Sequence, residues 1–170
     1  MSIRPVLKYG ESLLLEKSLP VEKIDEELRR LIDDMVETMY AGEGIGLAAP
    51  QVEVLKRIIV VDISSGEQPA ELVVLINPDI VAEEGSVVSE EGCLSFPNIT
   101  VEIERPQWLK VRGLTPEGKE VEIEAEDLLA RALYHEIDHL NGILIINRAS
   151  PLKRDLTIRK IRKKIKAGEW

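Results

Sequence analysis

At residues 126–142 the chain reads EDLLARALYHEIDHLNG. We expect an amphipathic helix over residues 126–140, because an Asn-Gly pair follows where a helix of this pattern ends. Residues four apart lie one turn apart on the same helix face, so His135 and His139 can both reach one cation. The predicted fold is therefore organised around a helix that carries two metal ligands.

Shorter patterns predict a helix on each side of this one and several strands. Apolar residues at helical spacing predict a helix over residues 24–40, and Gly42 follows where it should end. Ser150-Pro151 resembles an N-cap followed by a proline at the first helical position, which predicts a last helix. Strands bounded by turn-forming residues are expected at residues 57–63, 72–76, 101–104, 109–114 and 119–124.

Together these elements predict an α+β fold in a single domain that spans residues 1–170. We expect mostly antiparallel β-sheets packed around the central metal-binding helix, with N-terminal and C-terminal helices outside. Residues 42–46 read GEGIG, which predicts a loop because this stretch is too rich in glycine for a stable helix or strand.

The composition points to a globular, cytoplasmic protein. Of the 170 residues 44% are apolar and 31% charged, which separates the chain from disordered proteins. No apolar run approaches the roughly 20 residues that span a bilayer, and the N-terminus lacks a signal-peptide pattern. The single cysteine excludes an internal disulfide and suits a reducing compartment. We therefore expect no membrane partner.

The net charge of −9 is unevenly spread. Residues 153–170 hold eight Lys or Arg and two acids, so they carry +6 and the other 152 residues carry −15. An acidic body argues against DNA binding through the main domain. The basic C-terminal helix, residues 152–170, has two interpretations: a solvated helix face, or a docking surface for an anionic partner such as ribosomal RNA.

Glu136 directly follows the first of the only two histidines in the chain. In this position it can accept a proton from a metal-bound water. Coordination brings the pKa of water from 15.7 to about 7, which makes the bound water a usable nucleophile at neutral pH. The His-Glu-x-x-His pattern therefore predicts a catalytic metal site, against the alternative of two unrelated surface or core histidines.

A catalytic site of this kind needs a third protein ligand and an open position for water. No histidine follows His139, and the only later acids, Asp155 and Glu169, lie in the basic tail. Upstream stands Cys93, preceded by Gly92. A lone cysteine is often a small buried apolar side chain, but a thiolate is also an excellent ligand for a divalent transition metal.

Three segments resemble those that mark the peptide deformylase family, in the same order. They read GIGLAAPQ at residues 44–51, EGCLS at residues 91–95 and HEIDHLNG at residues 135–142. The resemblance covers nearly the whole chain. It implies a metallohydrolase that removes the formyl group from the N-terminal formyl-methionine of nascent polypeptides and releases formate. It also implies one divalent ion per chain, Fe(II), with Ni, Co or Zn able to substitute.

The resemblance assigns roles to residues of all three segments. It implies metal binding by Cys93, His135 and His139, with metal-bound water as nucleophile and Glu136 as general base and then acid. It implies an oxyanion hole made by the backbone N–H of Leu94 and the side-chain amide of Gln51. The implied substrate-contacting residues are Ile45, Gly46, Glu91 and Gly92.

Three residues depart from the family pattern. Tyr134 stands where relatives usually have Gln, and it is expected to affect the surroundings of the metal ligands rather than to ligate. Arg131, one turn before His135, stands where an apolar pocket residue is expected; it either reaches the pocket rim or favours polar or acidic substrates. Thr100 stands where many relatives carry a larger substrate-contacting residue.

Three other functions remain open. A metallopeptidase cutting internal peptide bonds shares His135, Glu136 and His139 but has no use for the segments around Cys93 and Gln51. A non-catalytic, metal-stabilised relative usually has four protein ligands, whereas only three are obvious here. The third alternative is a relative whose substrate is no longer formyl-methionine, which only the departures at Arg131 and Tyr134 suggest.

Overall fold

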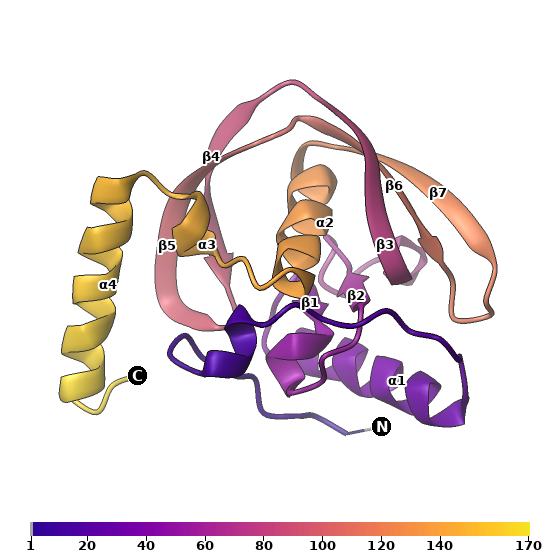
Figure 1. Ribbon diagram of the computed structural model, residues 1–170, viewed down its shortest axis with the longest axis horizontal. Coiled ribbons are helices and arrows are strands. Elements are labelled where there is room, and N and C mark those ends of the chain that lie inside the picture. The colour runs from indigo at the N-terminus through magenta and orange to yellow at the C-terminus, as the bar shows by residue number, and fades with distance from the viewer. Residues whose placement is uncertain (1) are drawn as a thin grey trace.

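The computed structural model describes residues 2–170, apart from the side chain of Pro69, and has an α+β fold with two antiparallel sheets (Figure 1). The strands of the larger sheet run in the order β1 (Gly46–Ala48), β2 (Ile58–Val61), β3 (Val73–Glu84), β6 (Trp108–Leu114) and β7 (Glu120–Glu126). The smaller sheet pairs β4 (Val87–Cys93) with β5 (Phe96–Arg105). The predicted fold class is confirmed.

The α-helices include the three that the sequence patterns predict and one short helix that was not predicted. They are α1 (Glu26–Ala41), α2 (Asp127–Leu140), a short α3 (Ile145–Arg148) and α4 (Pro151–Lys166), with 3-10 turns η1 (Ser12–Leu15), η2 (Ala49–Val52) and η3 (Pro69–Glu71). Asp25 caps α1 by accepting a hydrogen bond from the backbone N–H of Leu28, and Gly42 ends it. Ser150 caps α4 in the same way, as predicted. In residues 2–170, no helix has the length and apolar character needed to cross a membrane.

The strands differ from the prediction at four points, the first being that β5 begins five residues before the predicted residue 101. The glycine-rich loop ends one residue early, because Gly46 pairs with Val61 in β1. Strand β3 continues past Pro78, which is tolerated because the pairing shifts between Ile76 and Asp79 in a bulge. Strand β4 was not predicted, since it alternates only between half-buried and exposed residues and carries two adjacent glutamates.

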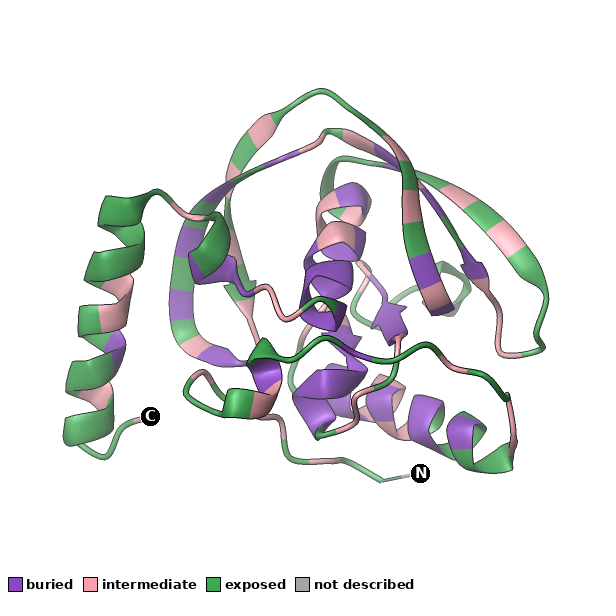
Figure 2. Cartoon of the chain, in the orientation of Figure 1, coloured by how far each residue is buried: buried purple, intermediate pink, exposed green. Residues whose placement is uncertain are grey.

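Helix α2 lies at the centre of the fold (Figure 1). It packs Ala130, Leu133 and Ile137 against one face of the larger sheet, and α1 covers the other face through residues such as Met35 and Met39. The smaller sheet forms a separate apolar cluster with α3 and α4, which α4 joins through the buried Ile161. Figure 2 shows α2 as almost continuously buried in its second half, where both histidines lie. The fold thus places the predicted metal-binding residues in its interior.

Candidate active site

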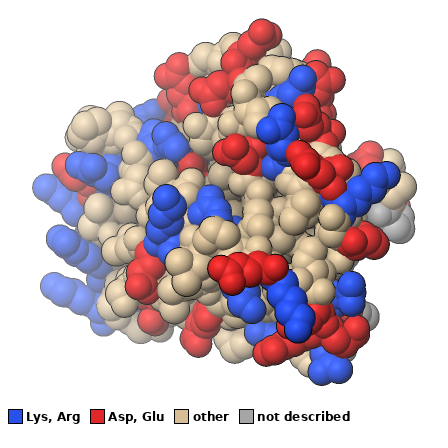
Figure 3. All heavy atoms as spheres, turned by 45° about the vertical axis from the view of Figure 1, so that its right-hand side comes forward, with Lys and Arg blue, Asp and Glu red and all other residues tan. Residues whose placement is uncertain are grey.

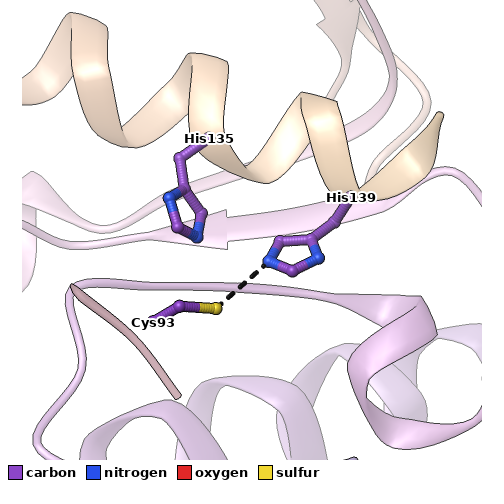
Figure 4. Close-up of side chains that lie close together, drawn as sticks. All are labelled: Cys93, His135 and His139. Carbon is purple, nitrogen blue, oxygen red and sulfur yellow. Dashed lines mark hydrogen bonds between the residues drawn. The ribbon is translucent and has the colours of Figure 1, made fainter. Parts of the chain in front are cut away.

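The structure brings three potential metal ligands together. His135 and His139 project from successive turns of α2 toward the last residue of β4, Cys93 (Figure 4). Their ligand atoms all lie within 4.8 Å of one another, and Cys93 Sγ is 3.4 Å from His139 Nε2. The sequence analysis predicted these three ligands, although Cys93 precedes His135 by more than forty residues.

The donor set fits a divalent transition metal. Ligand bonds of about 2.0–2.3 Å put two ligand atoms of one ion at most ~4.6 Å apart, close to the observed spread of the cluster. A thiolate and two imidazoles suit such an ion, and three protein ligands leave one tetrahedral position open. The neighbouring Glu136 has a buried carboxylate oxygen, Oε1, that has no hydrogen-bond partner among the described residues.

Glu91 orients His135. Its Oε1 lies 3.0 Å from His135 Nδ1, and since a carboxylate only accepts hydrogen bonds, Nδ1 carries the proton and Nε2 keeps its lone pair for a metal. Arg105 holds the same carboxylate through Nε and Nη2 at 2.6 and 2.9 Å. Burial raises the pKa of Glu91, but the hydrogen bonds from His135 and Arg105 outweigh burial and lower it to about 2.

The sequence analysis placed Glu91 among the substrate-contacting residues. Glu91 does line the cavity, yet both of its carboxylate oxygens are engaged by Arg105 and His135. Its carboxylate therefore has its partners within the protein, and its observed contacts are those of a residue that supports a metal ligand.

Sequence reasoning missed the ion-pair network behind this support. Arg105 Nη1 donates to Asp138 Oδ2 at 2.8 Å, and Arg148 donates to both oxygens of Asp138. The available signal was Arg105 itself, because it stands at a core-facing position of an alternating strand and a buried arginine is usually paired. Burial lowers the pKa of Arg105, but its pairs with Glu91 and Asp138 outweigh burial and raise it.

Tyr134 joins this network rather than the metal cluster. The guanidinium carbons of Arg105 and Arg148 lie 5.3 and 5.4 Å from the centre of its ring, a distance that allows cation–π attraction. Tyr134 therefore contacts the arginine that holds Glu91, which agrees with the expectation that it acts on the surroundings of the ligands.

Glu136 is 4% exposed and faces the cluster, with Oε2 3.9 Å from His135 Nε2. Burial raises the pKa of its carboxyl to about 7, which brings it close to neutral pH, where a general base works best. Gly46 makes room for it, because a Cβ on Gly46 would clash with Glu136 Oε2. The glycine of the first motif is thus explained by close approach of the backbone to this carboxylate.

Gln51 and Leu94 are both neighbours of Cys93. The buried Gln51 accepts a hydrogen bond from the backbone N–H of Ala48 through Oε1. Its Nε2 donates to Ser95 Oγ at 3.0 Å and points at Cys93 Sγ, 3.7 Å away. Leu94 follows Cys93 in the β4–β5 turn. The amide of Gln51 is therefore held as a donor beside the candidate ligand.

A cavity of about 440 Å³ opens onto these groups. Apart from His139, every residue that the sequence nominated lines it, and so do Leu128, Arg131 and Thr100. Mixed apolar walls with a few converging polar groups are typical of a binding site for a small ligand or a chain end. Cys93, His135 and His139 can therefore hold a divalent ion. The buried Glu136 and the oriented amide of Gln51 lie beside these ligands.

Comparison with known proteins gives matches that cover most of the chain. Residues 3–155 match the family model described as polypeptide deformylase. The chain is 51% identical to the peptide deformylase of Acidobacterium capsulatum over 170 residues, which is 100% of both chains. It is 54% identical over 164 residues to that of Thermodesulfovibrio yellowstonii, covering 96% of this chain and 99% of the relative.

Solved structures agree with the sequence relatives. The crystal structure of a peptide deformylase from Legionella pneumophila superposes with a TM-score of 0.91 at 42% identity and covers 98% of both chains. A peptide deformylase from Synechococcus elongatus in complex with actinonin gives a TM-score of 0.88 at 38% identity, covering 92% of this chain and 86% of that one.

Proposed function

The chain belongs to the peptide deformylase family, and from that premise we propose how its own residues remove the formyl group from formyl-methionine at the N-terminus of a nascent polypeptide. The observation that carries the proposal is the convergence of Cys93, His135 and His139 beside the buried Glu136, at the end of one cavity. The reaction is hydrolysis of a linear amide, and its products are formate and a free N-terminal amine.

Cys93, His135 and His139 would hold one divalent ion. When bound, this ion supplies the Lewis acidity that makes water a nucleophile at neutral pH and polarises the formyl carbonyl. We propose Fe(II) as the physiological ion, with Ni, Co or Zn able to take its place, because one thiolate and two imidazoles suit several of these ions. Glu91 supports the set by keeping the proton of His135 on Nδ1.

Glu136 moves the proton. As general base it takes a proton from the attacking water, and as general acid it delivers that proton to the amine nitrogen when the C–N bond breaks. Its burial supports this double role, since a carboxyl whose pKa is raised to about 7 can both accept and release a proton near neutral pH.

Gln51 and Leu94 stabilise the developing oxyanion. The side-chain amide of Gln51 is oriented by its hydrogen bond with the backbone of Ala48, which holds its Nε2 donor beside Cys93. The backbone N–H of Leu94 is the second donor of this oxyanion hole. One such donor commonly contributes roughly 2.7–4 kcal/mol to barrier lowering.

The substrate would bind by its backbone. Strand β1 is at the edge of the larger sheet, and both it and β4 contribute residues to the cavity wall. An extended peptide can pair with such an edge, and backbone pairing recognises many sequences. We propose that Ile45, Gly46 and Gly92 contact the peptide and that Ile45, Leu128 and His135 surround the methionine side chain. Nascent chains would meet the enzyme in the cytoplasm.

The test is formate release from an N-formyl-methionyl tripeptide by protein reconstituted anaerobically with Fe(II) or Ni(II). We expect formate and free amine in equal amounts, and loss of both after the ion is removed by a chelator. The matched control is the N-acetyl peptide, which tests selectivity for the formyl group. Cleavage of internal peptide bonds without formate release would instead identify a metallopeptidase.

We also propose that the basic helix α4 docks on the ribosome. Figure 3 shows Lys and Arg gathered on the side where α4 lies in Figure 1. Apart from the buried Ile161 and its half-buried neighbours, the helix is exposed. Ribosomal RNA is a dense polyanion, so such a helix can bind it electrostatically.

A charge-removed variant tests this docking without deleting the helix, which is needed because Ile161 belongs to the core. The variant replaces four exposed α4 residues by Gln: Arg159, Lys160, Lys163 and Lys166. Its matched control replaces four exposed residues elsewhere by Gln: Lys17, Lys23, Arg30 and Lys56. We expect co-sedimentation with ribosomes at low salt to fall only in the α4 variant. Binding that survives this variant and high salt would contradict the proposal.

A further inference from the structure

A segment near the N-terminus is hydrogen-bonded to both parts of the proposed oxyanion hole. The backbone N–H of Leu7 donates to the backbone carbonyl of Gln51 at 2.8 Å. The backbone N–H of Tyr9 donates to the backbone carbonyl of Ser95 at 2.9 Å, and Ser95 directly follows Leu94 in the chain. The segment therefore joins the backbone that carries the Gln51 amide to the backbone that carries the Leu94 N–H.

This bridging segment, residues 7–9, is connected in turn to Trp170. The chain beyond α4 turns back toward the N-terminal part (Figure 1), and Trp170 Nε1 donates to the backbone carbonyl of Tyr9 at 2.9 Å. The ring of Phe96 contacts both aromatic side chains, with its centre 5.2 Å from that of Tyr9 and 6.4 Å from that of Trp170. Phe96 is 1% exposed and lines the substrate cavity. Trp170 is thus connected to the site by a hydrogen bond and by aromatic packing.

The bridging segment is a connection between the two donors that the reaction does not use. Gln51 Nε2 carries two N–H groups, and it lies 3.0 Å from Ser95 Oγ and 3.7 Å from Cys93 Sγ. When the substrate oxygen takes one of these donors, the contact that it replaces is lost. The backbone bonds of Leu7 and Tyr9 involve no group that would bind the substrate, so they can persist throughout the reaction.

We propose, on the basis of the proposed function, that Trp170 is a positioning residue for the oxyanion hole. By holding Tyr9, it keeps the bridging segment in place, so that the Gln51 amide and the Leu94 N–H converge on one substrate oxygen. Neither Trp170 nor Tyr9 is among the residues that line the cavity, so both act through other residues. An oxyanion hole stabilises the transition state more than the bound substrate. Loss of positioning therefore lowers kcat and leaves KM nearly unchanged.

The experiment measures kcat and KM of two Trp170 variants with an N-formyl-methionyl tripeptide. Trp170→Phe keeps an aromatic ring but removes the indole N–H, and the loss of one hydrogen bond should lower kcat by roughly 2–10-fold. Trp170→Ala also removes the contact with Phe96, and misplacement of the donors should lower kcat by roughly 10–100-fold. The matched control is Trp108→Phe on β6, because this tryptophan is also half-buried but does not line the cavity. The control should keep nearly full kcat.

A double-mutant cycle with Gln51→Ala separates positioning from general stability. If Trp170 acts through the oxyanion hole, Trp170→Ala should lower kcat much less in the Gln51→Ala background, because one of the two donors is already absent. A loss of folded protein would instead lower kcat by the same factor in both backgrounds. Amide hydrogen exchange at Tyr9 should be faster in Trp170→Ala than in the unmodified protein, since the segment is held less firmly.

Three results would overturn the proposal: unchanged kcat in Trp170→Ala, equal factors in the two backgrounds, or unchanged exchange at Tyr9. Release of formate by the unmodified protein separates this proposal from the proposed function. If the unmodified protein releases formate, these results concern the role of Trp170 alone. If it releases none, the proposed function fails as well.

Discussion

Replacing Glu136 by Gln is expected to lower kcat for formate release by roughly 10²–10⁴-fold, the usual contribution of a positioned general base. Gln has nearly the same shape but cannot accept the proton of the attacking water. Because Cys93, His135 and His139 are unchanged, metal content should stay the same, which metal analysis of the purified protein can check. A rate loss with full metal content places the defect in the chemical step.

The chain offers a matched control for this substitution. Glu37 on α1 also has a buried carboxylate oxygen without a hydrogen-bond partner among the described residues, but it lies outside the cavity. Glu37→Gln should leave kcat within a few-fold of the unmodified protein. Equal losses in the two variants would mean that Glu136 acts through general stability. Full activity of Glu136→Gln would remove it from the mechanism.

Replacing Arg105 by Met is expected to destabilise the protein by about 3–5 kcal/mol, because it leaves buried carboxylates of Glu91 and Asp138 without their common partner. The arginine side chain is 3% exposed, and both ion pairs are shorter than 3 Å. The free energy of unfolding in urea measures the effect. Since Glu91 then loses part of its support, affinity for the metal should also fall by about 10–100-fold.

The control for Arg105 is Arg112→Met on the neighbouring strand of the chain, β6. Arg112 also pairs with two glutamates, but its side chain is 49% exposed. Exposed pairs contribute about 0–1 kcal/mol, so this variant should keep nearly full stability and metal affinity. If the two variants unfold at the same urea concentration, the buried network adds no more stability than the surface pairs.

Much of the fold followed from local patterns. The first two long helices and the start of the last were predicted within two residues of their observed ends, because capping by Asp25 or Ser150 and periodic apolar faces act over one or two turns. Strand β4 escaped prediction because its sheet has only two strands and none of its seven residues is fully buried. A strand of this kind leaves a weak apolar alternation in the sequence.

By itself, the sequence determined which groups can do the chemistry: two histidines one turn apart, the glutamate between them and a single cysteine. Helical periodicity is local, so the pairing of His135 with His139 needed no knowledge of the rest of the chain. Only the tertiary structure decided how Cys93 meets them, and that Arg105 and Glu91 hold His135 in one orientation. These contacts depend on the register of β4 with β5 and on the packing of α2, which are set by burial of distant segments against one another.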